Sequence, residues 1–203
     1  MLDTPTRTSR TGYRFLQWDA ENRVYHPGID RNWGPYGNSD LGQPVIPHTW
    51  GIVEYVSPEG YNGGLGNYLV VYYPHLRRWA RWLHLDRILV KVGDKTPPKV
   101  TIAHLGTTGT TSAHLHEEIL NEKGIAFVKD WKRPYGRYPT GLSKQSVASM
   151  WEDPEAFIRN NDHPVPGVDL HKELERAQNA LKWASGTRKT MLLRLIERLK
   201  RLI

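Results

Sequence analysis

The stretch 113-AHLHEEIL-120 has the composition of a β-strand and places His114 and His116 one residue apart. In an extended strand, side chains at i and i+2 point to the same face, so both imidazoles would look into one space. Three other runs are also typical of strands: 51-GIVEYV-56, 67-NYLVVYY-73 and 87-RILVKV-92. Gly, Pro, Asn and Asp separate these runs, and from about residue 14 to residue 128 this pattern predicts antiparallel β structure.

One glycine-rich stretch, 60-GYNGGLGNYLVVYY-73, precedes a predicted strand and must be compared with a phosphate-binding loop. A phosphate-binding loop lies between a strand and a helix, and Lys-Ser/Thr follows its glycines. This stretch has neither that order of elements nor those residues. We therefore interpret it as a hairpin or bulge turn in which the glycines bend the backbone.

The C-terminal part of the chain has a different character. Short helical turns are predicted to start at Ser143 or Ser146 and at Asp153-Pro154. A polar, proline-bearing linker over 161–168 then separates a domain over 1–160 from a tail over 169–203. The tail repeats apolar residues at helical spacing, which predicts two amphipathic helices, or one kinked at Gly186 with Thr187 as an N-cap. These apolar residues include Leu170, Leu174, Ala177, Leu181, Leu192, Leu195, Ile196 and Leu199.

Composition narrows the possible chemistry. The 203 residues are 38% hydrophobic and 24% charged, as in a globular domain, and no run approaches the roughly 18 apolar residues of a membrane span. The N-terminus has no apolar segment of the kind found in secretory signal peptides. Cysteine is absent, so disulfides and thiolate metal sites are excluded and any metal must bind His, Asp or Glu.

The net charge of +7 predicts a polyanionic partner: nucleic acid, an anionic membrane or an anionic cell-wall polymer. Residues 169–203 hold nine Lys/Arg and four Asp/Glu, so most of the excess charge lies in the tail. The tail's apolar stripe could pack on the β domain or on another copy of the chain. Alternatively, residues 187–203 could bind anionic membrane or lipopolysaccharide. Nucleic acid is not expected, because the tail has no aromatic platform beyond Trp183.

The segment 25-YHPGID-30 adds a second group of metal-binding side chains. Pro27-Gly28 favours a sharp turn over a helix, and such a turn can bring His26 and Asp30 to one ion. A catalytic zinc site needs three protein ligands and an open position for water. His26, Asp30 and one histidine of the His114/His116 pair would supply that set, and the other histidine could carry a proton.

A series of motifs in fixed order resembles the lysostaphin-type zinc metallopeptidases over about residues 14–128. In order, the motifs are His26-x-Gly28-x-Asp30, Gly42-Gln43-Pro44-Val45, Gly51-Ile52-Val53, Gly63-Gly64-x-Gly66-Asn67, Trp82-Leu83-His84-Leu85, Val92-Gly93-Asp94, Gly106-Thr107-Thr108-Gly109 and His114-Leu115-His116.

This resemblance implies that His26, Asp30 and His116 bind Zn²⁺ and that His114 is the general base. It also implies that His84 helps to hold the water or to stabilise the oxyanion. Enzymes of this type cleave peptide bonds of bacterial peptidoglycan, in the stem peptide or the cross-bridge. They have a compact antiparallel β fold with a narrow groove over the metal. The alternative is a non-catalytic wall-binding or regulatory protein of the same fold.

Two glutamates follow the second histidine. Glu117 stands where the family usually has an aromatic residue, and strand alternation predicts that it points away from the metal and affects packing. Glu118 falls on the histidine face, where it could orient His116 or His84, or simply be an exposed strand charge.

The biological setting follows more indirectly from the same features. A wall peptidase with a basic amphipathic tail and no signal peptide resembles a bacteriophage endolysin. Such an enzyme would accumulate in the host cytoplasm and act on the wall after release through the inner membrane, lysing the host. A virion-associated lysin and a bacterial wall-remodelling enzyme are the alternatives.

Overall fold

The computed structural model describes residues 4–6, 10–34, 37–58, 60–129 and 134–161, together with Gln178, Leu181 and Leu193. The chain divides into two units, residues 1–162 and residues 163–203. The predicted linker and amphipathic tail fall outside the described residues, apart from Asn161 and those three positions. No helix in the described part of the chain is long and apolar enough to cross a membrane.

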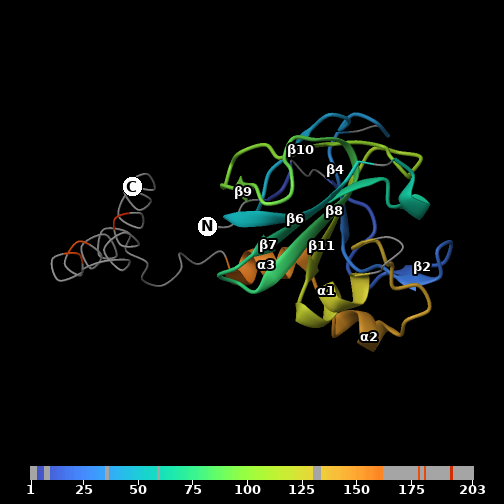
Figure 1. Cartoon of the computed structure of the whole chain (residues 1–203). Helices are drawn as coiled ribbons and strands as arrows, with labels where there is room; N and C mark the ends of the chain where they lie inside the picture. The colour runs from blue at the N-terminus through green and yellow to red at the C-terminus, as the bar shows by residue number, and fades with distance from the viewer. Residues whose placement is uncertain are drawn as a thin grey trace. The chain divides into compact units, whose positions relative to one another are not determined.

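A ten-stranded sheet forms the centre of the first unit (Figure 1). Its main path runs in the order β1 (Arg10–Thr11), β4 (Ile29–Asn32), β11 (Leu115–Leu120), β8 (Arg78–Ile88), β7 (Asn67–Tyr73), β6 (Gly51–Ser57) and β9 (Lys95–Thr96). Off this path, β10 (Ala103–Leu105) pairs with β8 and with β5 (Pro44–Val45), and β12 (Trp151–Glu152) pairs with β11. A separate hairpin joins β2 (Trp18–Asp19) to β3 (Val24–Tyr25). The described pairings are antiparallel, so the predicted fold class, mainly antiparallel β, is confirmed.

Four short helical segments accompany the sheet: η1 (Asn62–Gly64), α1 (Glu122–Val128), α2 (Lys144–Ala148) and α3 (Pro154–Asn161). The predicted start at Ser143 is confirmed, because its side chain caps α2 by accepting a hydrogen bond from the backbone N–H of Ser146. Helix α3 begins at the predicted Pro154. Helix α1 is not predicted by the sequence pattern, because its seven residues are too few to show a helical period.

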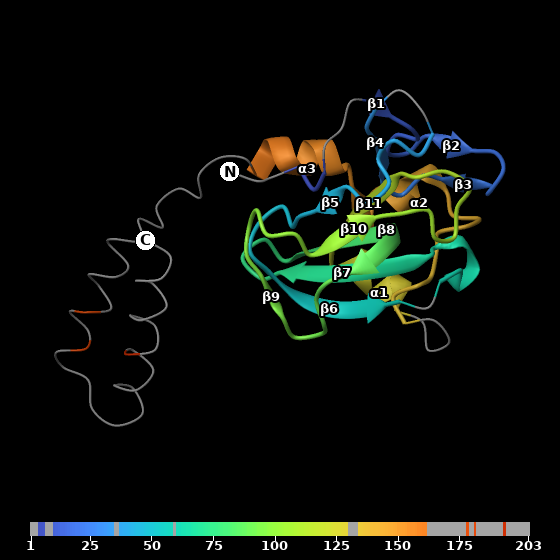
Figure 2. The ribbon, with the colours of Figure 1, turned by 90° about the horizontal axis from the view of Figure 1, so that it is seen from above.

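The central strands are buried on both faces. Along β7, Leu69 and Val71 belong to one hydrophobic cluster, whereas Tyr68 and Val70 belong to another. Helix α3 contributes Phe157 to the first cluster, and α1 and α2 contribute side chains to the second. Figure 2 shows β8, β7 and β6 side by side in this doubly covered sheet. Because both faces of β7 are buried, its sequence 67-NYLVVYY-73 is a nearly continuous run of apolar and aromatic residues.

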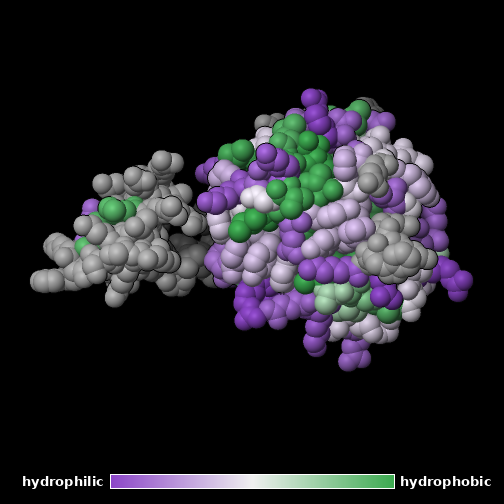
Figure 3. Space-filling view, viewed as in Figure 1, coloured by the Kyte–Doolittle hydropathy of each residue, from purple (hydrophilic) through white to green (hydrophobic). Residues whose placement is uncertain are grey.

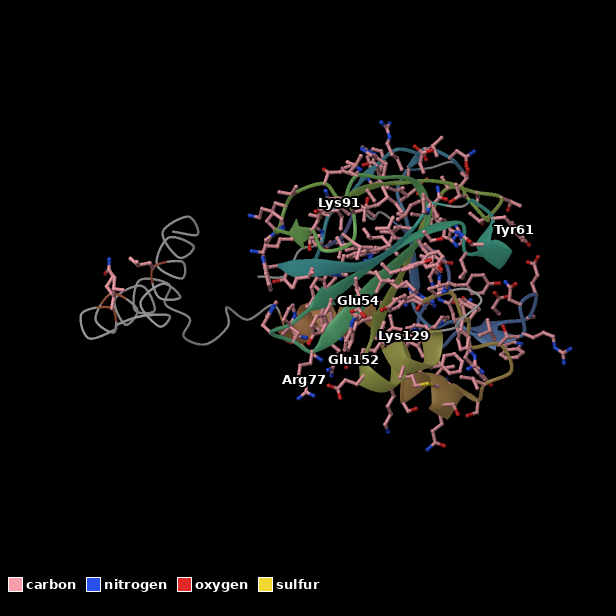
Figure 4. All side chains as sticks on the ribbon, in the orientation of Figure 1. Glu54, Tyr61, Arg77, Lys91, Lys129 and Glu152 are labelled. Carbon is pink, nitrogen blue, oxygen red and sulfur yellow. The ribbon has the colours of Figure 1, made fainter. Side chains whose placement is uncertain are left out.

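The predicted strand over residues 87–92 is wrong in most of its length. Strand β8 starts at Arg78 and ends at Ile88, and the chain then turns towards β9. Leu89 and Val92 are 48% and 60% exposed, so these two apolar side chains lie on the surface and not within the sheet. Figure 3 shows hydrophobic side chains gathered on this part of the surface, where Figure 4 labels Lys91.

The glycine-rich stretch before β7 contains η1 and a close approach between two loops. Gly66 has φ +66°, and a Cβ there would lie 2.0 Å from the carbonyl oxygen of Thr108. The pairing of β7 with β8 also shifts register between Asn67 and Leu69. The bulge-like turn predicted for these residues is confirmed, and it fixes the loop around Thr108 beside the histidines described next.

Candidate metal centre and active site

Strands β4 and β11 bring together the three residues predicted to bind metal. Asp30 and His116 are direct cross-strand partners, and His26 lies on the turn that leads into β4. Oδ1 of Asp30 lies 3.2 Å from Nε2 of His26 and 2.9 Å from Nδ1 of His116. One ligand atom from each residue lies within 4.8 Å of the other two, and all three residues are buried.

Hydrogen bonds at the rear of both imidazoles fix which nitrogen faces the site. Nδ1 of His26 lies 2.8 Å from the carbonyl oxygen of Gly28, which can only accept, so Nδ1 carries the proton and Nε2 is directed at Asp30. For His116 the order is reversed, because Nε2 donates to Oε1 of Glu118 at 3.0 Å and Nδ1 is directed at Asp30. Two imidazole nitrogens and one carboxylate oxygen therefore converge, a donor set that fits Zn²⁺.

The electrostatics of this cluster favour a cation. Burial raises the pKa of Asp30, but hydrogen bonds from His116 and His26 outweigh it and hold that pKa well below its usual range. Burial lowers the pKa of His116, but its bonds to Asp30 and Glu118 outweigh it and raise that pKa to about 9. A cation that binds Nδ1 of His116 displaces a proton from the same position.

Glu118 connects the cluster to the rest of the fold. It is fully buried and accepts hydrogen bonds from Arg81 and, at 2.7 Å, from Nε1 of Trp151. Arg81 also donates to the backbone carbonyls of Tyr135 and Arg137. The prediction that Glu118 orients a histidine is confirmed for His116, and the alternative of an exposed strand charge is wrong.

His114 and His84, the two predicted catalytic residues, lie beside the cluster. Their ring centroids are 4.6 Å apart, and Nε2 of His114 lies 3.8 Å from Oδ1 of Asp30. Each donates Nδ1–H to a backbone carbonyl at 3.0 Å, His114 to Ser112 and His84 to Thr108. In the neutral form of each ring, Nε2 is then the acceptor. Burial, followed by the nearby charges of His114 and His116, lowers the pKa of His84 to about 3, so His84 is neutral near pH 7.

A cleft of about 1030 Å³ opens over these five residues. Tyr13 lines it and stacks on His26 at 5.5 Å, and Tyr138 lines it 6.1 Å from the ring of His116. Tyr61, which is 73% exposed, borders the cleft next to η1 (Figure 4). Sequence reasoning missed Tyr13 and Tyr138, because neither lies in a metal-binding motif and only the folded chain brings them to the site.

Glu117 points to the opposite face of β11, as strand alternation predicts. It is fully buried and forms ion pairs with Arg31 and His48. Burial raises its pKa, but Arg31 and His48 outweigh it and lower that pKa to about 2. The expectation that Glu117 contributes to packing rather than to the metal face is confirmed.

The chain is similar to proteins of known activity. The peptidoglycan DD-endopeptidase ShyC of Vibrio cholerae serotype O1 is 42% identical over 136 residues, which cover 66% of this chain and 28% of ShyC. ShyB, named likewise and from the same organism, is 38% identical over 91 residues, or 42% of this chain and 20% of ShyB. The chain spans less than a third of the length of these curated relatives.

The fold has a counterpart of known structure. The catalytic domain of the antimicrobial peptidase lysostaphin from Staphylococcus simulans matches with a TM-score of 0.52 and 22% identity, over 74% of this chain and 92% of that chain. Residues 25–127, which contain all five predicted site residues, match Peptidase family M23. The chain therefore belongs to Peptidase family M23.

Proposed function

We propose that this protein is a zinc-dependent endopeptidase that hydrolyses peptide bonds in bacterial peptidoglycan. The observation that carries the proposal is the convergence of His26, Asp30 and His116 on one point, with His114 and His84 beside it, in a single cleft. Family membership supports the peptidase reaction. The names of ShyC and ShyB, peptidoglycan DD-endopeptidases, support the substrate class.

His26, Asp30 and His116 would hold the Zn²⁺ ion. When bound, Zn²⁺ polarises a carbonyl and makes a water more acidic. The remaining requirements, a proton acceptor and a fixed substrate position, belong to residues of the chain itself.

His114 is the residue placed to accept a proton. Its Nδ1–H is bound to the carbonyl of Ser112, so in the neutral ring Nε2 is the acceptor, and this atom lies 3.8 Å from Oδ1 of Asp30 in the cleft. A positioned imidazole contributes about 10²- to 10⁴-fold as a general base. After accepting the proton, His114 can return it to the amine of the leaving group.

His84 has a narrower role than the sequence resemblance implies. With Nδ1–H bound to Thr108 and a pKa of about 3, its Nε2 can accept a hydrogen bond but does not donate one. Of the two roles implied for His84, holding the water fits this geometry. Stabilising an oxyanion requires a donor, which neutral His84 does not present to the cleft.

The segment from Tyr135 to Tyr138, most of which lines the cleft, is tied to the sheet by hydrogen bonds. Arg81 donates to the carbonyls of Tyr135 and Arg137, and the hydroxyl of Tyr135 donates to Glu54 at 2.6 Å. Glu54 also forms an ion pair with Lys129 at 3.2 Å, and Figure 4 labels both residues. Side chains held by such contacts keep a bound peptide in one position relative to His114.

The proposal is tested on purified cell walls. Walls with direct cross-links and walls with glycine cross-bridges are digested, and released muropeptides are identified by mass spectrometry. We expect dimers of the directly cross-linked walls to be cut to monomers at the bond between the two stem peptides, with loss of activity under chelation and return with added zinc. If muropeptides were released only from the glycine-bridged walls, the bond that is cut would instead be assigned to the cross-bridge.

The rival function, a non-catalytic wall-binding or regulatory protein of this fold, predicts a different result from the same digestion. It gives wall binding in a sedimentation assay with no new muropeptides at any zinc concentration. That outcome would overturn the proposed activity. A role in phage-induced lysis, accumulation in a host cytoplasm, and membrane or lipopolysaccharide binding by residues 187–203 remain predictions from the sequence.

A further inference from the structure

Strand β4 carries Asp30, and its backbone hydrogen bonds reach β11, β1 and the adjoining residues Gly12 and Tyr13. It pairs with β11 over three residues, from Ile29 to Arg31, and with the two-residue β1 on its other side. Asp30 lies in β4 and His26 on the turn before it. Two of the three candidate ligands therefore depend on how firmly β4 is held against β11.

A buried ion pair joins β4 to β11 on the face opposite the metal ligands. Arg31 lies opposite Leu115 and Glu117 opposite Ile29, so the two charged residues are diagonal neighbours across the Asp30–His116 pair. Nε of Arg31 donates to Oε2 of Glu117, and their side chains are 4% and 0% exposed. The ion pair and the metal ligands thus occupy opposite faces of the same few residues.

Glu117 is itself fixed from two further elements. Nε2 of His48 contacts its Oε1, and Nδ1 of His48 lies 3.0 Å from the hydroxyl of Tyr73 on β7. The ring of His48 also stacks on Trp82 of β8 at 5.7 Å. Because Tyr73 and Trp82 lie in the central strands β7 and β8, they fix His48, which in turn fixes Glu117 against Arg31 of β4.

In the family that the sequence resembles, an aromatic residue usually follows the second histidine, whereas here the buried carboxylate of Glu117 stands there. Here Nη2 of Arg31 is buried without a hydrogen-bond partner among the described residues, so Arg31 depends on Glu117 for its charge balance. Losing Glu117 would leave a buried cation next to Asp30.

We propose that Glu117 is a positioning residue for the metal centre: through Arg31 it fixes β4 against β11 and so sets the separation of Asp30 and His116. This inference rests on the zinc site of the proposed function. It predicts that Glu117, which does not contact the metal, controls metal affinity as well as stability.

The test compares Glu117→Gln with Val53→Ala. Gln keeps the shape of Glu117 but loses its charge. Val53 is a buried residue of β6, which β7, β8 and β11 separate from β4, so Val53→Ala lowers stability without touching β4. The zinc Kd of each folded apo-protein is measured by competition with a metal indicator, well below its Tm, and the visible absorption of the Co²⁺ form is recorded.

We expect Glu117→Gln to raise the zinc Kd about tenfold, the lower end of the effect of partners outside the ligand set, and to alter the Co²⁺ spectrum. Val53→Ala should lower Tm but leave Kd and spectrum unchanged. A Glu117→Gln protein with lowered Tm and wild-type Kd and spectrum would overturn the inference. If Glu117→Gln does not fold, Arg31→Lys, which keeps the charge but removes the guanidinium that contacts Glu117, replaces it under the same criteria. Absence of zinc binding by the wild type would instead refute the proposed function.

Discussion

The two histidines of β11 share a face but have different partners. His116 points Nδ1 at Asp30 because Glu118 takes its Nε2–H, whereas Nδ1 of His114 is bound to the carbonyl of Ser112. Strand alternation alone predicts that His114, His116 and Glu118 face together and that Glu117 faces away. It cannot predict which nitrogen faces the site, because that depends on the hydrogen bonds to Glu118 and Ser112, and Glu118 is itself held by Arg81, which is distant in the sequence.

At the residue scale, Glu118→Gln is predicted to be strongly destabilising. The substitution leaves the buried guanidinium of Arg81 without its carboxylate, and removing one partner of a buried pair costs about 3–5 kcal/mol. The free energy of unfolding is measured by urea denaturation. Glu122→Gln is the matched control, because Glu122 and Arg77 form an exposed pair worth about 0–1 kcal/mol. Equal effects of the two substitutions would contradict the buried network described for Glu118.

At the scale of elements, the sequence predicts the strands better than their ends. Strands β6, β7 and β11 match the predicted runs because each is apolar or aromatic and bounded by turn residues. The start of β8 is missed, because Arg78 and Arg81 interrupt its apolar pattern. Arg81 is nevertheless fully buried, because Glu118 and two backbone carbonyls accept its hydrogen bonds. No local sequence pattern predicts those partners.

The turn between β3 and β4 is predicted to tolerate no side chain at Gly28. A Cβ there would lie 2.0 Å from the carbonyl oxygen of Glu117, which is backbone and cannot rotate away. We expect Gly28→Ala to reduce the free energy of unfolding by about 1–3 kcal/mol and to weaken zinc binding, because the turn carries His26. Gly37→Ala is the control, as nothing lies within 4 Å of a Cβ at that position. Thermal unfolding and zinc titration of both variants check this, and equal stability would contradict the close contact.

At the scale of the whole molecule, the family match over residues 25–127 and the sheet account for the first unit of the chain. The order of the motifs resembles that of the lysostaphin-type metallopeptidases, and this resemblance is what predicts the fold. The basic tail is a separate matter. Its net charge of +5 and its apolar stripe come from the sequence, and packing, self-association or membrane binding by residues 187–203 stay open as predictions.

The most direct test of the zinc centre compares His116→Ala with His114→Ala, purified in parallel with the wild type. Zinc per chain is measured by mass spectrometry, and turnover by muropeptide release. We predict one zinc in the wild type and in His114→Ala, little zinc in His116→Ala, and a loss of turnover of at least about 10²-fold in both variants. Full turnover by His114→Ala, or full zinc content in His116→Ala, would contradict the roles given to the two histidines.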